Sequence, residues 1–117
     1  GLSYTSFSYD HMEVTPTDSH VKIAVTITNK GNYDGDEVVQ VYVKDVISSH
    51  STPEKNLKAF KREHFKAGES KVVELLVDKK ELELYQGNGK WELEPGEFIF
   101  MAGGSSESLP LKTTITL

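Results

Sequence analysis

The stretch VKIAVTITNKGNYDGDEVVQVYVKD, residues 21–45, decides the fold of this chain. In its first part Val21, Ile23, Val25 and Ile27 share one parity, while polar or small residues occupy the other. Alternation with a period of two is typical of a strand that buries one face. A second apolar run, rich in valine, follows a connection that contains glycines and acidic residues. The stretch therefore predicts two strands joined by a turn.

The rest of the chain repeats this pattern in short segments. Further strands are expected at 4–9, 72–77, 91–94, 98–101 and 111–117, separated by turn signals that mostly contain glycine. One helical turn is expected over 78–84, where Asp78 and Glu81 resemble a capping box. Seven or eight short strands with turns at this spacing predict an all-β chain folded as an antiparallel β-sandwich.

Length and composition limit the kind of protein. A chain of 117 residues fits a single domain over 1–117 and can bury enough surface for one core. Cysteine is absent, so a disulfide framework, a thiolate metal site and a cysteine nucleophile are excluded, and the compartment stays open. The net charge of -5, without a basic block, argues against nucleic acid as a partner. No stretch approaches the roughly 18 apolar residues that span a membrane.

Two predicted strands carry apolar residues on both faces. Valines and a tyrosine fill both parities of the run that contains Val38 and Tyr42, and 98–101 reads Phe-Ile-Phe-Met. An antiparallel sandwich strand normally exposes one face to water, so something is expected to cover the second face. Either the chain's own loops and long side chains cover it, or the face is a docking surface for another domain. The pattern alone leaves both interpretations open.

The acid-rich connection is the first candidate for a functional site. Asn32, Asp34, Asp36 and Glu37 supply oxygen ligands, but a calcium loop needs a glycine at its sixth position and a bidentate glutamate at its twelfth. Counted from Asn32, these positions hold Glu37 and Val43, and the flanks are predicted strands rather than helices. The sequence therefore favours a turn between strands over a calcium loop or a catalytic acid pair.

The remaining candidate sites also favour structural roles. Paired glutamates at 81/83 and 92/94 sit on one solvent-facing parity, unlike the two carboxyl groups that a glycosidase holds across a cleft. The four histidines lack metal-binding spacing and are expected at the surface; they are His11, His20, His50 and His64. Trp91 is in phase with Leu93, which predicts a packed, inward-facing ring rather than a sugar-stacking platform. No catalytic, metal-binding or cofactor-binding residue is predicted.

Four stretches in order carry a resemblance to a known family, and together they cover nearly the whole chain. They are GLSYTSF, VTITNKGNYDGDEVVQVYVKD, PEKNLKAFKREHFKAGES and GKWELEPGEFIFMAGGSS. The chain resembles the fibronectin type III-like domain found at the C-terminus of glycoside hydrolase family 3 enzymes, the β-glucosidases and β-xylosidases. The resemblance implies an immunoglobulin-like (fibronectin type III-like) sandwich. It also implies a parent enzyme that is periplasmic or secreted.

In that family the catalytic aspartate and glutamate lie in preceding barrel and α/β domains, so the resemblance implies an accessory domain without activity of its own. Its expected partners are the catalytic domains of the same polypeptide, against which it packs and which it stabilises. Residues expected at this interdomain interface are Tyr4, Val38, Tyr42, Phe60 and Trp91. The loop predicted over 45–58 is expected either to cross between the sheets or to reach the substrate entrance.

Two other classes of function remain as alternatives. A carbohydrate-binding module requires exposed, coplanar aromatic rings, and the sequence offers no obvious row of them, which makes direct glycan contact the less favoured reading. A bacterial adhesion or spacer sandwich domain predicts tandem copies of the unit, and no internal repeat is visible in the chain.

Overall fold

The computed structural model describes residues 6–46 and 55–117, and most of this part is strand. The strands are β1 (Phe7–Pro16), β2 (His20–Asn29), β3 (Gly35–Asp45), β4 (Asn56–Phe65), β5 (Ser70–Asp78), β6 (Leu84–Gly87), β7 (Lys90–Glu92), β8 (Glu97–Gly103) and β9 (Leu111–Thr116). A short 3-10 helix, η1 (Lys79–Leu82), joins β5 to β6. No helix of the described residues is both long enough and apolar enough to span a bilayer.

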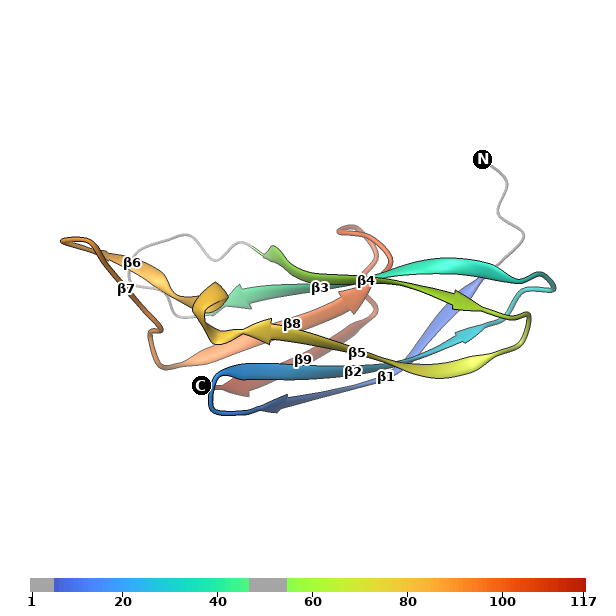
Figure 1. Cartoon of the computed structure of the whole chain (residues 1–117), viewed down its shortest axis with the longest axis horizontal. Helices are drawn as coiled ribbons and strands as arrows, with labels where there is room; N and C mark the ends of the chain where they lie inside the picture. The colour runs from blue at the N-terminus through green and yellow to red at the C-terminus, as the bar shows by residue number, and fades with distance from the viewer. Residues whose placement is uncertain (1–5, 47–54) are drawn as a thin grey trace.

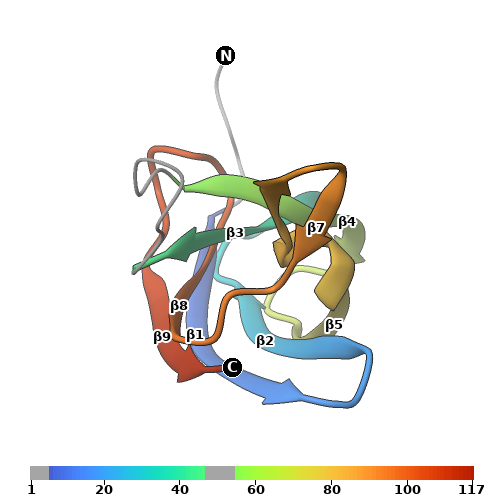
Figure 2. The same ribbon diagram turned by 90° about the vertical axis from the view of Figure 1, so that its left-hand side faces the viewer.

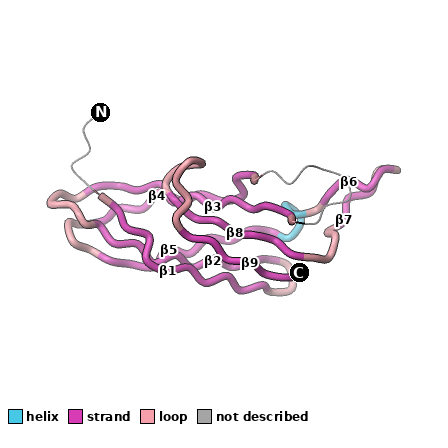
Figure 3. Tube along the Cα trace, turned by 180° about the vertical axis from the view of Figure 1, so that it is seen from behind, coloured by secondary structure: helices cyan, strands magenta, loops and turns pink. Residues whose placement is uncertain are grey.

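Two antiparallel sheets face each other and form the sandwich (Figures 1 and 2). One sheet has the order β1-β2-β5 and the other the order β4-β3-β8-β9. A third, two-stranded sheet, β6-β7, lies outside both. The shape is elongated, with extents of 54 × 29 × 21 Å (Figure 3). The predicted all-β, immunoglobulin-like antiparallel sandwich is confirmed, and its two main sheets hold seven strands.

The core lies between the two sheets and follows the predicted alternation. Every second residue of β2, from Val21 to Ile27, is fully buried. The facing sheet contributes Val39 and Val41 from β3 and Phe100 from β8, each fully buried. One continuous cluster joins these side chains, so the parity read from the sequence correctly separates inner from outer positions.

Asn29 is a buried polar residue at the end of β2 that holds the connection to β3. Its side-chain Nδ2 donates to the Tyr33 carbonyl at 2.9 Å, and its Oδ1 accepts from the Gly31 N–H at 2.9 Å. The Asn29 carbonyl also accepts from the Gly68 N–H at 2.9 Å, in the turn between β4 and β5. The predicted turn therefore contains a fully satisfied buried amide that ties two neighbouring connections together.

The second face of the four-stranded sheet is partly covered by the chain itself. Met101 is buried although it lies outside the core cluster, and the register places it between Tyr42 and Lys112 on the flanking strands. The half-buried Tyr42 donates its hydroxyl to Gln40 Oε1 at 2.8 Å. For Met101 and Tyr42, cover by neighbouring side chains accounts for the apolar residues on this face.

Two predictions need correction. Trp91 does not pack inward: its side chain is 61% exposed, because β7 belongs to the separate hairpin and its parity does not continue to the partly buried Leu93. The predicted loop 45–58 is too long at its end, since β4 already begins at Asn56 and pairs with β3. Residues 47–54 of that loop lie outside the described residues.

The predicted helical turn is shorter than expected and is a 3-10 turn. Its N-cap is Asp78, whose Oδ1 accepts from the Lys80 N–H at 3.0 Å, as the capping pattern predicts. The first expected strand, 4–9, is only partly described, because residues 1–5 lie outside the described part of the chain. Its predicted end is too early, since β1 runs from Phe7 to Pro16.

Replacing Asn29 with alanine should lower the free energy of unfolding by about 2 kcal/mol, since the part-buried hydrogen bonds of its amide with the Gly31 N–H and the Tyr33 carbonyl would be lost. Chemical denaturation measures the change. Asn32→Ala, in the exposed part of the same connection, is the control and should stay within about 0.5 kcal/mol of the parent chain. Equal losses in the two variants would contradict the role given to Asn29.

Candidate functional site

The acidic side chains of the connection before β3 do not converge on one point. Asp34 Oδ1 accepts from the Ala67 N–H at 2.8 Å, in the turn between β4 and β5. Glu37 Oε2 accepts from the Tyr9 hydroxyl at 2.8 Å, across the two sheets. Each carboxylate therefore joins two segments of the fold, which is a structural use of the acid-rich stretch.

Asp36 lies against two basic side chains of β4. Its Oδ1 is 2.7 Å from His64 Nδ1, and its Oδ2 accepts from Arg62 Nε at 2.8 Å. The hydrogen bond from His64, followed by that from Arg62, lowers the pKa of Asp36 below its ordinary value. A carboxyl group held in its charged form in this way is poorly suited to act as a general acid.

Burial and the adjacent Glu37 carboxylate raise the pKa of Tyr9 above its ordinary value. The tyrosine therefore remains a neutral hydroxyl that donates to Glu37 and fastens β1 to β3. The arrangement stabilises the sandwich and does not favour proton exchange with a substrate.

The histidines lie where the sequence predicted them, at the surface. His11 Nε2 is 3.3 Å from Glu13, and His20 Nε2 is 3.9 Å from Asp78. His50 lies outside the described residues. Within 6–46 and 55–117, no three side chains of the metal-binding types are grouped so that they could hold an ion.

Exposed apolar side chains are concentrated in one part of the sequence. Among residues 6–46 and 55–117, the large exposed ones all fall between the β2–β3 connection and β7, and β1, β2, β8 and β9 carry none. They are Tyr33, Val38, Val46, Leu57, Phe60, Val72, Leu76, Tyr85 and Trp91. β4 and β5 are edge strands of the two sheets. Val38, Leu57 and Phe60 lie on the outer face of the four-stranded sheet, and Val72 and Leu76 lie on the outer face of the three-stranded sheet, so the two groups flank the open side between β4 and β5 from opposite faces. We call Val38, Leu57, Phe60, Val72 and Leu76 the β4–β5 surface.

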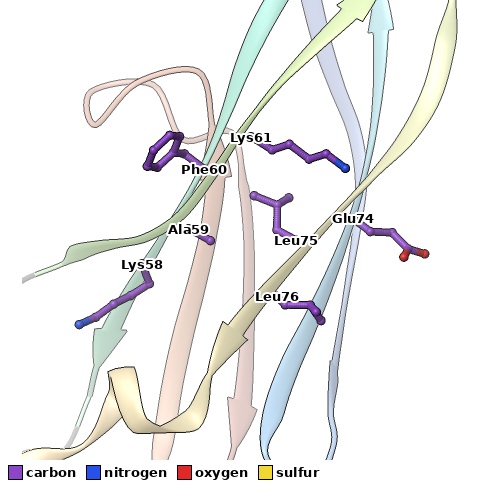
Figure 4. A pocket seen from close by; sticks show the side chains of 7 residues that line it. All are labelled: Lys58, Ala59, Phe60, Lys61, Glu74, Leu75 and Leu76. Atoms are coloured by element: carbon purple, nitrogen blue, oxygen red, sulfur yellow. The ribbon is translucent and has the colours of Figure 1, made fainter.

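A groove runs along this open side, with a volume of about 420 Å³ (Figure 4). Ala59 of β4 and Leu75 of β5 line it between Phe60, which is 70% exposed, and Leu76, which is 61% exposed. Lys58, Lys61 and Glu74 add charges to its lining. An apolar floor with charged margins suits a protein side chain better than it suits a reacting substrate, because no carboxyl pair faces across it.

Next to the groove, charged residues at inward positions of β4 and β5 form ion pairs across the open side. Glu63 on β4 forms two ion pairs: its Oε1 lies 3.3 Å from Lys61 Nζ, and its Oε2 lies 3.6 Å from Lys71 Nζ of β5. Lys71 Nζ also lies 4.8 Å from the centre of the buried Phe65 ring. These charges discourage strand-to-strand pairing at the edge, so the groove is left as the apolar part of this side.

The structure brings together some of the residues predicted for an interdomain interface. Val38 is 38% exposed and Phe60 is 70% exposed, and the register places both on the outer face of the four-stranded sheet with the half-buried Tyr42. Trp91 lies apart from them, on β7. Tyr4 lies outside the described residues.

Sequence reasoning missed other exposed apolar residues of the same region. Val72 and Leu76 occupy the outward parity of β5 and are 56% and 61% exposed. Leu57 and Tyr85 were missed as well, and they are 45% and 47% exposed. The signal was present in β5, since an apolar residue on the parity opposite to the buried set needs a reason of its own.

This geometry defines an immunoglobulin-like sandwich whose distinguishing feature is an exposed apolar side rather than a catalytic cleft. The family model of the fibronectin type III-like domain matches residues 37–106, more than half of the chain. The chain belongs to the fibronectin type III-like domain family.

Relatives of the chain are much longer proteins. It is 40% identical to thermostable β-glucosidase B of Acetivibrio thermocellus, over 98% of this chain and 16% of the relative. It is 39% identical to a β-xylosidase of Formosa agariphila, over 97% of this chain and 16% of the relative. The chain thus spans about a sixth of the length of these curated relatives.

Solved structures share the fold over the whole chain. A β-glucosidase from Streptomyces venezuelae, solved in complex with D-glucose, matches with a TM-score of 0.92 and 31% identity, over 100% of this chain and 15% of the other. A GH3 β-glucosidase from Bifidobacterium adolescentis matches with a TM-score of 0.91 and 31% identity, over 100% and 18%.

Replacing His64 with alanine should raise the pKa of Asp36 toward its ordinary value, because the largest contribution to its lowered pKa is the His64 hydrogen bond. Since the folded-state pKa is lowered, this contact stabilises the fold above the ordinary Asp pKa, and its contribution is lost as the pH falls through the lowered value. Carboxyl-carbon NMR titration measures the shift. The control is His11→Ala, because His11 lies on β1 and does not contact Asp36. An Asp36 pKa that moves equally in both variants would count against the assignment.

Proposed function

We propose that residues 1–117 form one accessory domain of a family 3 glycoside hydrolase of the β-glucosidase or β-xylosidase type, without catalytic residues of its own. Support comes from relatives that match nearly the whole chain while it fills only about a sixth of their length. A domain that supplies so small a part of a hydrolase, and whose described carboxylates serve structural contacts, leaves the chemistry to the rest of the polypeptide.

The domain acts by packing against the catalytic part of the same polypeptide and stabilising it. The observation that carries this role is the set of exposed apolar side chains on β3, β4 and β5, which flank the open side between β4 and β5. Isolated exposed apolar residues are ordinary, but a contiguous apolar surface with a polar margin marks an interaction site. The groove between Phe60 and Leu76 is a recess in this surface, and a partner's apolar side chain can fit into it.

The energetic scale is adequate for a stabilising role. Complete burial of a leucine or phenylalanine side chain contributes about 1.5–3 kcal/mol. Phe60 and Leu76 are both more than half exposed in the isolated chain, so most of this contribution is still to be gained on docking. Two such residues at the centre of an interface would add several kcal/mol, which compares with the whole stability of a small domain.

Changing Phe60 and Leu76 together to lysine should lower the melting temperature of the parent enzyme by at least about 5 °C, because two apolar side chains would no longer be buried at the interface. The isolated chain should be nearly unaffected, since both side chains are exposed there. Calorimetry on both forms measures the difference.

The matched control places the same charges on the other side of the sandwich, as Thr15→Lys and Thr114→Lys at exposed positions of β1 and β9. This control should leave the parent enzyme unchanged. A parent enzyme from which residues 1–117 are removed, yet which keeps its melting temperature and its hydrolysis of aryl β-glycosides, would refute the proposed function.

A further inference from the structure

The β6–β7 hairpin has no partner among the strands of the sandwich. Within the part of the chain that the structure describes, its two strands pair only with each other, in a sheet separate from the other two. Figures 1 and 3 show the hairpin extending beyond one end of the sandwich, opposite the end that holds the β2–β3 connection. An isolated two-stranded hairpin is at best marginally stable in water, so its persistence here calls for further stabilisation.

Two large aromatic rings stand on this hairpin. Tyr85 and Trp91 are directly opposite each other in the register and are 47% and 61% exposed. Their ring centres lie 5.3 Å apart with an angle of 56° between the planes. A cross-strand aromatic pair of this kind stabilises the hairpin by up to about 1 kcal/mol, but it leaves much of both rings in water.

The hairpin turn holds the pair in a defined orientation. The Tyr85 hydroxyl accepts a hydrogen bond from the Gly89 N–H at 2.9 Å, which ties the ring to the turn. Gly87 and Gly89 have φ values of +91° and +75°, which glycine adopts without strain. Trp91 is therefore presented by a preorganised support, and less conformational entropy would be lost when a partner buries it.

We propose that the hairpin is an anchor, with Trp91 inserting into an apolar pocket of the neighbouring domain of the same polypeptide and Tyr85 acting as its positioning residue. This inference rests on the proposed function and names a second contact of that interface. The occupant follows from chain length, because relatives extend far beyond the region that matches this chain. Tryptophan and tyrosine are also the residue types enriched at the energetic centres of protein interfaces.

The hairpin and the β4–β5 surface can engage one partner. The chain passes from Leu76 on β5 through η1 directly into β6, so the two apolar features are neighbours in sequence. Figure 2, viewed from the hairpin end, places β6–β7 beside the edges formed by β4 and β5. A domain that covers this open side would therefore meet the hairpin at the end of the same surface.

The geometry of the pair favours a protein partner over a glycan. A sugar ring stacks on a flat aromatic face, and a glycan chain needs two or three coplanar rings. Tyr85 and Trp91 are tilted by 56° and contact each other, which produces a ridge rather than a platform. A ridge fits a recess in a folded surface.

The experiment uses the fact that Trp91 is the only tryptophan of the chain. The chain is labelled with 5-fluorotryptophan, so that it gives a single fluorine resonance, and the separately produced remainder of the parent polypeptide is added. The proposal expects this resonance to shift and to lose its sensitivity to H₂O/D₂O exchange as the ring leaves water. Trp91→Ala should weaken the association by at least about 30-fold, the scale of an interface hot spot.

Tyr33→Ala is the matched control, because Tyr33 is 61% exposed, the same fraction as Trp91, and belongs to the connection at the opposite end. It should bind as the unaltered chain does. Tyr85→Phe keeps the ring but loses the bond to Gly89, and should weaken the association less than Trp91→Ala. If Trp91→Ala folds poorly by circular dichroism, Trp91→Phe replaces it, with a smaller expected loss.

The outcomes separate this inference from the proposed function. If the chain binds the remainder and Trp91→Ala binds equally well, the anchor is wrong and the proposed function stands. If the chain does not bind and the resonance does not move, both are wrong. A resonance that moves with cellohexaose or xylohexaose, or with the concentration of the chain alone, would replace the neighbouring domain with a glycan or with a second copy, and would overturn the proposal.

Discussion

The sandwich depends on the alternation of side chains along β2, which commits four fully buried aliphatic residues to the inner face. A shift of one residue in its pairing with β5 would exchange these for lysine, alanine and threonine and would destroy the core. The facing strands β3 and β8 meet the same demand with Val39, Val41 and Phe100. Once both inner faces are filled, the remaining freedom of the sequence lies in the outer faces, the edges and the connections.

The two open sides of the sandwich use this freedom differently. Along the side formed by β1 and β9, the described residues carry no large exposed apolar side chain. Along the other side, Lys61, Glu63 and Lys71 bring charges to inward positions, while the groove nearby remains apolar. Charges of this kind block the pairing of edge strands with other chains. The groove beside them has a floor of Ala59 and Leu75, and Lys61 belongs to its lining. This arrangement supports a proposed docking of a side chain rather than of an added strand.

The sequence predicted a strand well where apolar and polar residues alternate along it with a period of two, and poorly where they do not. β2 alternates cleanly, so its inner residues could be read directly. β4 was not recognised as a strand, because Lys61 and Glu63 occupy its inward positions and hide the period of two. Trp91 was placed inward by a parity that ends at Glu92, and only the separate pairing of β6 with β7 shows that the ring faces out. The contacts of Asp34 and Glu37 depend on residues 33 and 28 positions away, which local patterns do not encode.

The two ends of the molecule also differ in a way that bears on docking. At the end that holds the β2–β3 connection, Asp34 accepts a hydrogen bond from Ala67 in the turn between β4 and β5. The buried Asn29 bonds to Tyr33 within the connection and to Gly68 in that same turn. The chain's own polar contacts therefore hold this end together. At the opposite end, the hairpin extends beyond both sheets and keeps two aromatic rings in water. Polar groups that already bond to one another gain little free energy from a partner. Exposed rings on a preorganised support gain free energy when a partner buries the surface that they still expose to water. The asymmetry therefore supports the proposal that association involves the hairpin end and the open side of β4 and β5 rather than the acid-rich turn.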